Sequence, residues 1–327
     1  MIIKGKGKDE NPMTEASGAS PRNGCKDHIT VCLCTYQRPE LLRKLLERVF
    51  AQRTDGLFTI SASVVDNDLE LSGKAVIDDL LKNPDSDISY SPVPDKNLAL
   101  LRNVSVDRSR GEYVAFIDDD EYPADDWLLR LYTTVGEFQA DGALGPVVPE
   151  YLVPPPSWIV RGKICERARL PTGSRLHWGQ TRTGNALLKR SLFLEPGNRF
   201  DLKYRLGAED DGLFQKLMGQ GHQFVWCDEA VVFEQVPASR LSLAYYSKRS
   251  RLIGYMTYAY YREDRSRFGN AQFFLKSCLA AGIYGALMPV SRVFGYHRYA
   301  KLVIKYQFHK AVVLTHLGRL RIERRDI

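Results

Sequence analysis

The sequence predicts an α/β protein whose mostly parallel, twisted sheet is flanked by helices. Two observations carry this prediction. Apolar, β-rich runs alternate with stretches of helical periodicity in the first part of the chain, and each run ends in a polar or acidic segment. Because strands that alternate with helices are typical of right-handed βαβ units, the expected architecture is a Rossmann-like sheet. A helical appendage is expected at the C-terminus.

The first unit begins with the apolar run from Ile29 to Leu33. A polar loop, Thr35 to Pro39, separates this run from a stretch between Glu40 and Gln52 in which leucines recur at helical spacing. This order predicts a strand, a loop and an amphipathic helix.

Two further strands are expected. The run from Ile60 to Val65 stops at Asp66, and the helix-like stretch from Leu98 to Ser109 leads into the apolar run from Tyr113 to Ile117. Ligands bind at the carboxyl ends of strands in open sheets of this kind, so we expect the chemistry at that edge.

The later part of the chain is less regular. It contains a Pro-rich segment at 153–157, an Arg-rich stretch through Arg175, a short apolar piece at 186–188 and an acidic cluster at 209–211. We interpret it as the acceptor half of the same domain, residues 28–255. Residues 1–27 are rich in Gly, Asn, Ser, Lys and Asp and are expected to be a disordered leader.

The composition limits the classes of site. Six cysteines are scattered without a CxxC pair or zinc spacing, which indicates neither a disulfide framework nor a structural metal site and fits a reducing cytoplasm. The formal charge of +7 equals the local excess of residues 291–327, which contain nine Lys or Arg and two Asp or Glu. Such a basic end suits an anionic membrane or a nucleic acid, and is equally often a solvated surface.

Four carboxylates, Asp118 to Glu121, follow the third strand directly. Their crowding costs electrostatic free energy unless a cation neutralises it. Oxygen ligands at such a site suit Mg²⁺ or Mn²⁺, which also grip a diphosphate. A solvated acidic turn is the alternative, and its position after an apolar strand favours the metal.

A second acidic cluster, Glu209 to Asp211, opens a segment with a helical apolar face. The helix dipole favours the ionised form there, as a general base that takes a proton from an acceptor hydroxyl requires. Helix capping is the alternative interpretation, and three acids in a row exceed what capping needs.

Ordered motifs along the chain carry a family resemblance. They are Thr35-Tyr36-x-Arg38-Pro39, Val64-Val65-Asp66-Asn67, Asn97 with Leu101-Arg102-Asn103, Phe116-Ile117-Asp118-Asp119-Asp120, Thr183-Gly184-Asn185 and Glu209-Asp210. Together they resemble family 2 of the inverting nucleotide-sugar glycosyltransferases, which have the GT-A fold. Gly145-Pro146-Val147 and the segment from Val231 to Arg240 are most similar to exopolysaccharide enzymes of the succinoglycan type. The resemblance covers roughly residues 29–255.

This resemblance implies a role for each matching position. The donor, most often a uridine diphosphate sugar, would be bound by Thr35, Tyr36, Arg38, Glu40, Asp66, Asn97, Arg102, Asp118 and Asp119. Asp120 would bind the metal, Asp210 would be the catalytic base beside Glu209, and Gly184, Asn185 and Asp211 would face the acceptor. The implied reaction is metal-dependent, inverting transfer of a sugar to a glycan hydroxyl.

Two departures from the family pattern affect these expectations. Many relatives carry a histidine after the late strand, where this chain has Glu234, which we expect to supply a metal ligand instead. The Gln-x-x-Arg-Trp motif of processive relatives is missing, which favours addition of a single sugar. Arg249 and Arg251 are the nearest basic residues, and they are expected either to clamp the leaving diphosphate or to be surface charge.

Residues 256–327 are expected to form a helical, basic segment that associates with membrane. Its apolar run from Cys278 to Val290 has thirteen residues, which is short for a membrane span of about 20 residues. An interfacial helix would place the enzyme on the inner face of the plasma membrane, near a polyprenyl-diphosphate-linked acceptor. A helix packed on the catalytic domain is the alternative.

Two other functions share part of this pattern. A sugar-nucleotide nucleotidyltransferase would share the sheet and the acidic metal site, but it should show a Gly-rich phosphate loop, and the segment Thr35 to Pro39 contains no glycine. A nucleic-acid-binding protein would rest on the basic tail alone, because no recognised binding motif is present. No nucleic-acid partner is therefore expected.

Overall fold

The computed structural model describes residues 26–322. The expected leader, residues 1–27, lies outside the described residues except for Lys26 and Asp27, and so do the last basic residues, Arg324 and Arg325.

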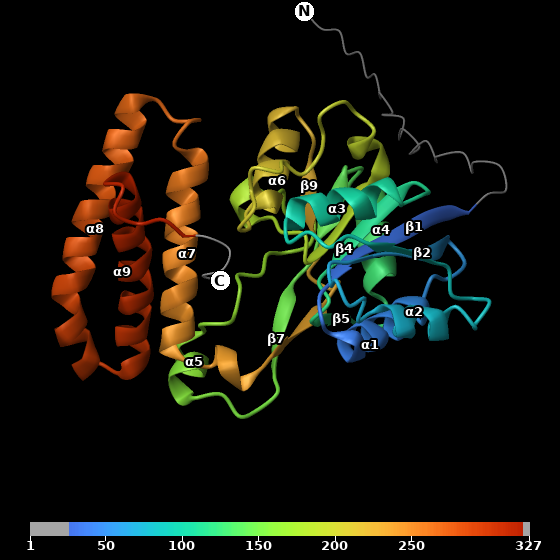
Figure 1. The fold of residues 1–327 in the computed structure, drawn as a ribbon, viewed down its shortest axis with the longest axis horizontal. Helices are drawn as coiled ribbons and strands as arrows, with labels where there is room; N and C mark the ends of the chain where they lie inside the picture. The colour runs from blue at the N-terminus through green and yellow to red at the C-terminus, as the bar shows by residue number, and fades with distance from the viewer. Residues whose placement is uncertain (1–25, 323–327) are drawn as a thin grey trace, which may run out of the picture.

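Strands and helices alternate through the first part of the chain, as the sequence predicts (Figure 1). The elements are β1 (Asp27–Thr35), α1 (Pro39–Phe50), β2 (Phe58–Asp66), α2 (Lys74–Leu80), β3 (Ile88–Pro92), α3 (Leu98–Asp107), β4 (Tyr113–Ile117), β5 (Glu121–Pro123), α4 (Trp127–Glu137), β6 (Gly142–Leu144) and β7 (Val147–Tyr151).

The later part is more helical. Its elements are α5 (Ser157–Gly162), η1 (Trp178–Gln180), β8 (Asn185–Lys189), η2 (Arg190–Phe193), α6 (Glu209–Gly219), β9 (Phe224–Trp226), β10 (Val232–Val236), η3 (Ala238–Arg240), α7 (Leu243–Tyr261), α8 (Arg267–Val293) and α9 (Tyr296–His316).

The main sheet has seven strands in the order β3-β2-β1-β4-β8-β6-β9. Strands β1, β2, β3 and β4 are parallel, whereas β8 runs antiparallel to both β4 and β6. The sheet is therefore mostly parallel, and the fold class predicted from the sequence is confirmed. The carboxyl ends of β1, β2 and β4 share one edge, because these neighbours run in the same direction.

Helices cover both faces of this sheet. Apolar residues of α1, α2 and α4 pack on one face, and those of α3, η2 and α6 pack on the other. The periodic leucines of the first helix explain the first core, since Leu42, Leu45 and Leu46 are buried against the sheet. The two cores thus hold the sheet in place, and the site is built at the edge where β1, β2 and β4 end.

A second sheet, β5-β10-β7, lies beside that edge. Strand β5 follows the acidic turn after β4 and pairs antiparallel with β10, so that Glu121 and Glu234 are register partners. This pairing brings the late part of the chain against the acidic turn.

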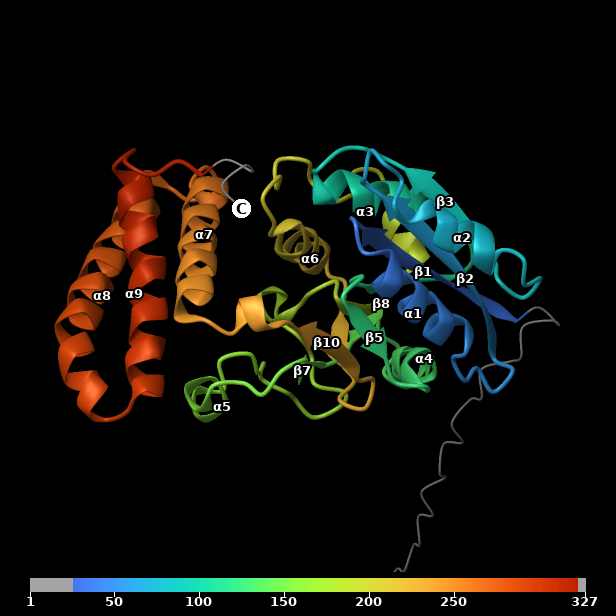
Figure 2. The same ribbon diagram turned by 60° about the horizontal axis from the view of Figure 1, so that its bottom comes forward.

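The C-terminal helices α7, α8 and α9 form a separate layer, with α9 packed against both α7 and α8. In Figures 1 and 2, α7 is the one of these three helices that lies nearest to α6, and α8 lies at the outer edge of the layer. The expected boundary at residue 255 falls inside α7. This helix therefore belongs to both of the expected segments, 28–255 and 256–327.

Helix α8 is longer than the sequence analysis expected. It runs for 27 residues, because Lys276 and the aromatic residues before it continue the helix on the N-terminal side of the thirteen-residue apolar run. Among residues 26–322, it is the one helix long and apolar enough to cross a membrane by length and composition. The apolar run from Cys278 to Val290 lies inside this longer helix.

The position of α7 depends on close contact with α9 at Gly254. A Cβ atom at this position would lie 2.3 Å from the carbonyl oxygen of Phe308, whereas one at Gly282 in α8 would meet nothing within 4 Å. We expect Gly254→Ala to lower the free energy of unfolding by about 1–3 kcal/mol through this overlap. The control, Gly282→Ala, should raise it by about 0.5–1 kcal/mol through helix propensity. Equal effects in urea unfolding would contradict the packing role.

Candidate active site

The structure brings the two acidic clusters to one edge of the sheet. Asp118 to Glu121 follow β4, and Glu209 to Asp211 form the first turn of α6. A single side chain from α3 joins them: Arg102 donates from Nε to Glu209 Oε1 at 3.1 Å and from Nη2 to Asp118 Oδ1 at 3.2 Å. The clusters therefore belong to one site.

Burial makes this bridge electrostatically demanding. The side chains of Arg102 and Glu209 are 8% and 3% exposed, and Glu209 Oε2 has no hydrogen-bond partner among the described residues. Burial raises the pKa of Glu209 to about 7, while the Arg102 guanidinium opposes the rise. Arg102 was expected near donor phosphate or ribose, and the structure shows it beneath the acids as their common counter-charge.

Asp119 ties the loop after β1 to the acidic turn. Its carboxylate accepts hydrogen bonds from Thr35 Oγ1 at 3.0 Å, from the Tyr36 amide at 3.4 Å and from Arg38 Nη1 at 2.7 Å. Burial raises the pKa of Asp119, and the Arg38 guanidinium counters this effect. Three expected donor residues, Thr35, Tyr36 and Arg38, are thus gathered by a fourth.

Asp120 and Glu234, the expected metal ligands, lie close enough for one guanidinium to bridge them. Arg240 Nη2 donates to Asp120 Oδ2 and Nη1 donates to Glu234 Oε1, each at 2.7 Å. Arg38 also approaches Asp120 Oδ2, at 3.3 Å. The pair suits Mg²⁺ or Mn²⁺ that takes its other ligands from phosphate and water. A site of three protein ligands is not formed, because no three His, Cys, Asp or Glu side chains within residues 26–322 gather at metal-binding spacing.

Glu121 is the most confined acid of the turn. Its Oε2 accepts a hydrogen bond from the Asp118 amide at 3.1 Å, and a Cβ atom added at Gly184 would lie 3.0 Å from its Oε1. Burial, followed by the charge of Asp118, holds the pKa of Glu121 well above its usual range. Gly184, expected on the acceptor side, leaves little room for a side chain, because the carboxylates of Glu121 and Asp118 lie close to it.

Three other predicted site residues are engaged by the fold itself. Asp66 accepts hydrogen bonds from the amides of Asp68 and Gly73 and from the Tyr90 hydroxyl. Asn97 caps α3. Asn185 donates to the carbonyl oxygens of Pro146 and Ala230 and accepts from Trp127 Nε1. All three side chains are buried and hold the loops of the site, and their expected contacts with donor or acceptor stay predictions.

A cavity of about 780 Å³ lies between α6 and α7. Asp210 and Asp211 form one wall, and α7 supplies a mixed wall that includes Arg249, Arg251 and Met256. Burial and the neighbouring Asp210 raise the pKa of Asp211 to about 6. The cavity joins acids, cations and apolar side chains, as a pocket for an amphiphilic molecule would.

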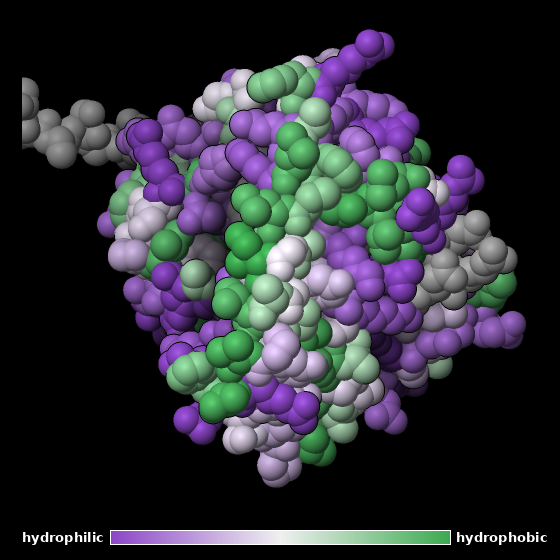
Figure 3. Space-filling view, turned by 90° about the vertical axis from the view of Figure 1, so that its left-hand side faces the viewer, coloured by the Kyte–Doolittle hydropathy of each residue, from purple (hydrophilic) through white to green (hydrophobic). Residues whose placement is uncertain are grey.

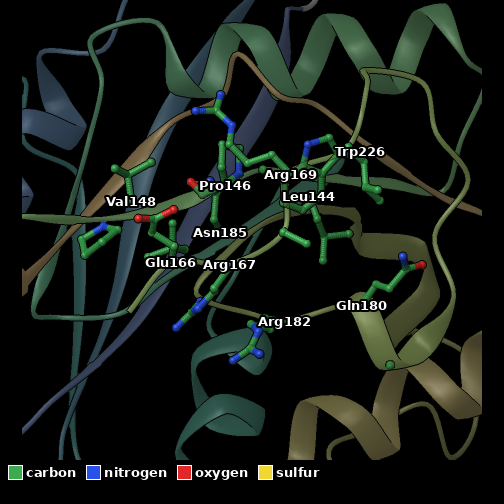
Figure 4. Close-up of a pocket in the computed structure, with 16 residues that line it drawn as sticks. Leu144, Pro146, Val148, Glu166, Arg167, Arg169, Gln180, Arg182, Asn185 and Trp226 are labelled. Atoms are coloured by element: carbon green, nitrogen blue, oxygen red, sulfur yellow. Dashed lines mark hydrogen bonds between the residues drawn. The ribbon is translucent and has the colours of Figure 1, made fainter. Parts of the chain in front are cut away.

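A smaller cavity, of about 390 Å³, opens beside the first (Figure 4). Arg167 and Arg182 lie together on one side of it, and Arg169 lies on the other. Arg182 lines both cavities and forms no ion pair within residues 26–322, whereas Arg167 approaches Glu234 at 3.6 Å. Arg167 and Arg182 therefore place positive charge between Glu234 and the larger cavity.

A third hollow, of about 290 Å³, is lined by Tyr36, Asn67 and Lys96 among others. Asn67 Oδ1 is buried and has no hydrogen-bond partner in the described chain. An orphaned acceptor beside an exposed tyrosine ring suits the edge and face of a nucleotide base. Glu40, also expected at the donor, is exposed in the first turn of α1.

Several residues of the site were missed by the sequence analysis. Arg240 carries no local signal because one of its partners, Asp120, is distant in sequence, and Arg182 is placed in the cavity walls only by the fold. Asn67 belongs to a matched motif, but within that motif only Asp66 was expected to bind the donor. Glu121 was counted in the acidic cluster without a role, although its place at a strand start could have suggested burial.

The chain is similar to several known proteins. Residues 30–195 match the family described as glycosyl transferase family 2. The chain is 36% identical over 226 residues to the succinoglycan biosynthesis protein ExoM of Rhizobium meliloti, covering 68% of this chain and 71% of that protein.

Two solved structures resemble the fold. The mannosyltransferase PcManGT from Pyrobaculum calidifontis, in complex with GDP-Man and Mn²⁺, has a TM-score of 0.62 at 16% identity, covering 91% of this chain and 89% of that one. TarS of S. aureus, in complex with UDP, has a TM-score of 0.50 at 14% identity, covering 91% and 94%. At this identity the likeness shows the fold alone.

The raised pKa of Glu209 predicts a pH-dependent stability. The folded chain retains a proton that the unfolded chain loses above about pH 4.5, so this stabilisation is present at low pH and lost as the pH rises to about 7. Relative to wild type, Glu209→Gln should therefore gain up to about 1.4 kcal/mol of unfolding free energy per pH unit between about pH 5 and 7. Urea unfolding across this range measures the gain, with exposed Glu40→Gln as the control. Parallel profiles for wild type and Glu209→Gln would contradict it.

Proposed function

The chain belongs to glycosyl transferase family 2 and is a glycosyltransferase with the GT-A fold, and from this premise we propose that it transfers one sugar, with inversion, from a nucleotide diphosphate donor to a glycan hydroxyl. The observation that carries the proposal is the Arg102 bridge between the acidic turn and the first turn of α6. This bridge supports the proposal, because it links the acidic turn proposed to hold the donor to the helix turn that contains the proposed base.

In the proposed step, Asp210 accepts the proton of the acceptor hydroxyl. The hydroxyl oxygen forms a bond to the anomeric carbon as the bond from that carbon to the diphosphate oxygen breaks, and the nucleoside diphosphate leaves with the electron pair. Attack from the face opposite the leaving group inverts the anomeric configuration. The position of Asp210 in the wall of the larger cavity, in the first turn of α6, supports its role as base.

The donor is proposed to be a uridine diphosphate sugar. Asn67 and Tyr36 would receive the base, with the buried Asp66 fixing their loop, and Asp118 would contact the ribose or the sugar. Mg²⁺ or Mn²⁺ between Asp120 and Glu234 would neutralise charge on the diphosphate. Mn²⁺ in the PcManGT complex and UDP in the TarS complex support this assignment.

The acceptor is proposed to be a polyprenyl-diphosphate-linked glycan of exopolysaccharide biosynthesis. The name of the ExoM relative supports the pathway. The larger cavity supports the lipid linkage, because Arg182 and Arg249 offer cations for a diphosphate while Leu252, Ile253 and Met256 offer apolar contacts. We propose that the product is this glycan extended by a single sugar.

We propose peripheral contact with the inner face of the plasma membrane through the outer face of α8. No charged residue occurs between Lys276 and Arg292, and Leu275 and Leu279 are 64% and 66% exposed. Figure 3 shows this face as a hydrophobic band bordered by hydrophilic residues. An apolar strip with cations at both ends suits an anionic lipid surface.

Replacing the proposed base tests the mechanism. We expect Asp210→Asn to slow transfer by ~10²–10⁴-fold, because a positioned base is lost while the donor contacts remain. Transfer is measured as UDP released from UDP-sugars in the presence of Mn²⁺ and acceptor, and UDP binding is measured by calorimetry. Asp211→Asn is the matched control and should lose less. Near-normal turnover by Asp210→Asn would remove it from the role.

Replacing apolar residues of α8 with acidic residues tests the membrane contact. We expect the double variant Leu279→Glu with Ile283→Glu to lose most of its co-sedimentation with phosphatidylglycerol vesicles, because acidic groups on the strip are repelled by anionic lipid. Leu69→Glu alters a leucine that is 77% exposed on the catalytic part and should sediment like wild type. A wild-type chain that stays in the supernatant, or dimerises through this face in light scattering without lipid, would contradict the proposal.

A further inference from the structure

Arg240 occupies the space between the two carboxylates proposed to bind the cation. It comes from the short helix η3, and its two Nη atoms each lie 2.7 Å from an acceptor, Asp120 Oδ2 and Glu234 Oε1. All three side chains are largely buried, at 22%, 15% and 21% exposed. A fork that spans two carboxylates is a strong, directional arrangement.

A divalent cation and this guanidinium compete for the same oxygens. Mg²⁺ requires its oxygen ligands at about 2.0–2.1 Å in near-octahedral geometry. The guanidinium lies between Asp120 Oδ2 and Glu234 Oε1. A cation that takes these two oxygens must therefore displace Arg240 from at least one of them.

The other cations of the site do not relieve this competition. Arg38 contacts Asp120 Oδ2 at 3.3 Å and Arg167 approaches Glu234 Oε2 at 3.6 Å, so both carboxylates keep positive neighbours as a cation arrives. A released Arg240 adds to that positive charge unless an anion receives it. A diphosphate is such an anion, and the planar guanidinium fork matches phosphate geometry.

We propose that Arg240 makes cation binding at Asp120 and Glu234 conditional on the donor diphosphate. This inference rests on the proposed function. Without diphosphate, the guanidinium is the counter-charge of the two carboxylates. With diphosphate, the guanidinium moves to the phosphates and the cation replaces it. Linkage requires the effect to be reciprocal, so the cation strengthens diphosphate binding by the same factor.

Mn²⁺ binding to the full-length chain tests this coupling directly. Free Mn²⁺ is measured by electron paramagnetic resonance with and without UDP, for wild type and for Arg240→Gln. In wild type, UDP should strengthen Mn²⁺ binding by at least about tenfold. Arg240→Gln should bind Mn²⁺ at least about tenfold more tightly than wild type without UDP, and the effect of UDP should be smaller than in wild type, because only the direct contact between phosphate and ion remains.

Two further variants sharpen the result. Arg169→Gln removes another arginine that forms a 2.7 Å ion pair, with Asp228 on the far side of the smaller cavity, and it should bind Mn²⁺ like wild type. Arg240→Lys keeps the charge but lacks the fork, so its coupling should be intermediate. If Arg240→Gln does not fold, UDP titrations of wild type with and without Mn²⁺ must still differ by the same factor.

The contrary outcomes are distinct. Equal Mn²⁺ affinity in wild type and Arg240→Gln, or UDP binding that Mn²⁺ leaves unchanged, would overturn the role of Arg240 while the donor site stands. UDP binding without Mn²⁺ binding, in wild type and in Arg240→Gln alike, would mean that the two carboxylates hold no ion, and would also overturn the role of Arg240. Failure of UDP to bind at all would overturn the proposed function itself.

Discussion

The Arg102 bridge is the interaction on which the site depends. Glu209 and Asp118 are separated by more than ninety positions, and each would repel the other if brought together without a counter-charge. One buried guanidinium from α3 satisfies both, and α3 itself is fixed between the sheet and the loop of Leu202 through Asn97. The first turn of α6 therefore meets the end of β4 because a third element neutralises their charge.

The same device recurs around the acidic turn. Arg38 follows β1 and pairs with Asp119, and Arg240 precedes α7 and pairs with Asp120. Arginines from three elements thus converge on carboxylates of a single turn. Removing one partner of such a buried pair costs more than the pair itself contributes, because the remaining charge is left unpaired. The charges of the turn are consequently paired by arginines before any ligand binds.

Local pattern in the sequence was sufficient for the sheet, because strands β1, β2 and β4 are apolar runs that alternate with stretches of helical periodicity. It also located the acidic turn and the first turn of α6. It could not show how distant backbone uses a side chain: Asn185 belongs to a matched motif, and its amide donates to the carbonyl oxygens of Pro146 and Ala230. Arg240 and the orphaned Asn67 Oδ1 acquire their meaning only from folded neighbours, which no spacing rule contains.

A crystal structure of the full chain with UDP and Mn²⁺ tests the shared cleft most directly. The account predicts an anomalous manganese peak beside Asp120, the diphosphate between that ion and Arg240, and the Asp210 carboxylate facing the open side of the terminal phosphate across the larger cavity. UDP bound away from the turn that follows β4, or Asp210 separated from the phosphates by the body of the sheet, would contradict it.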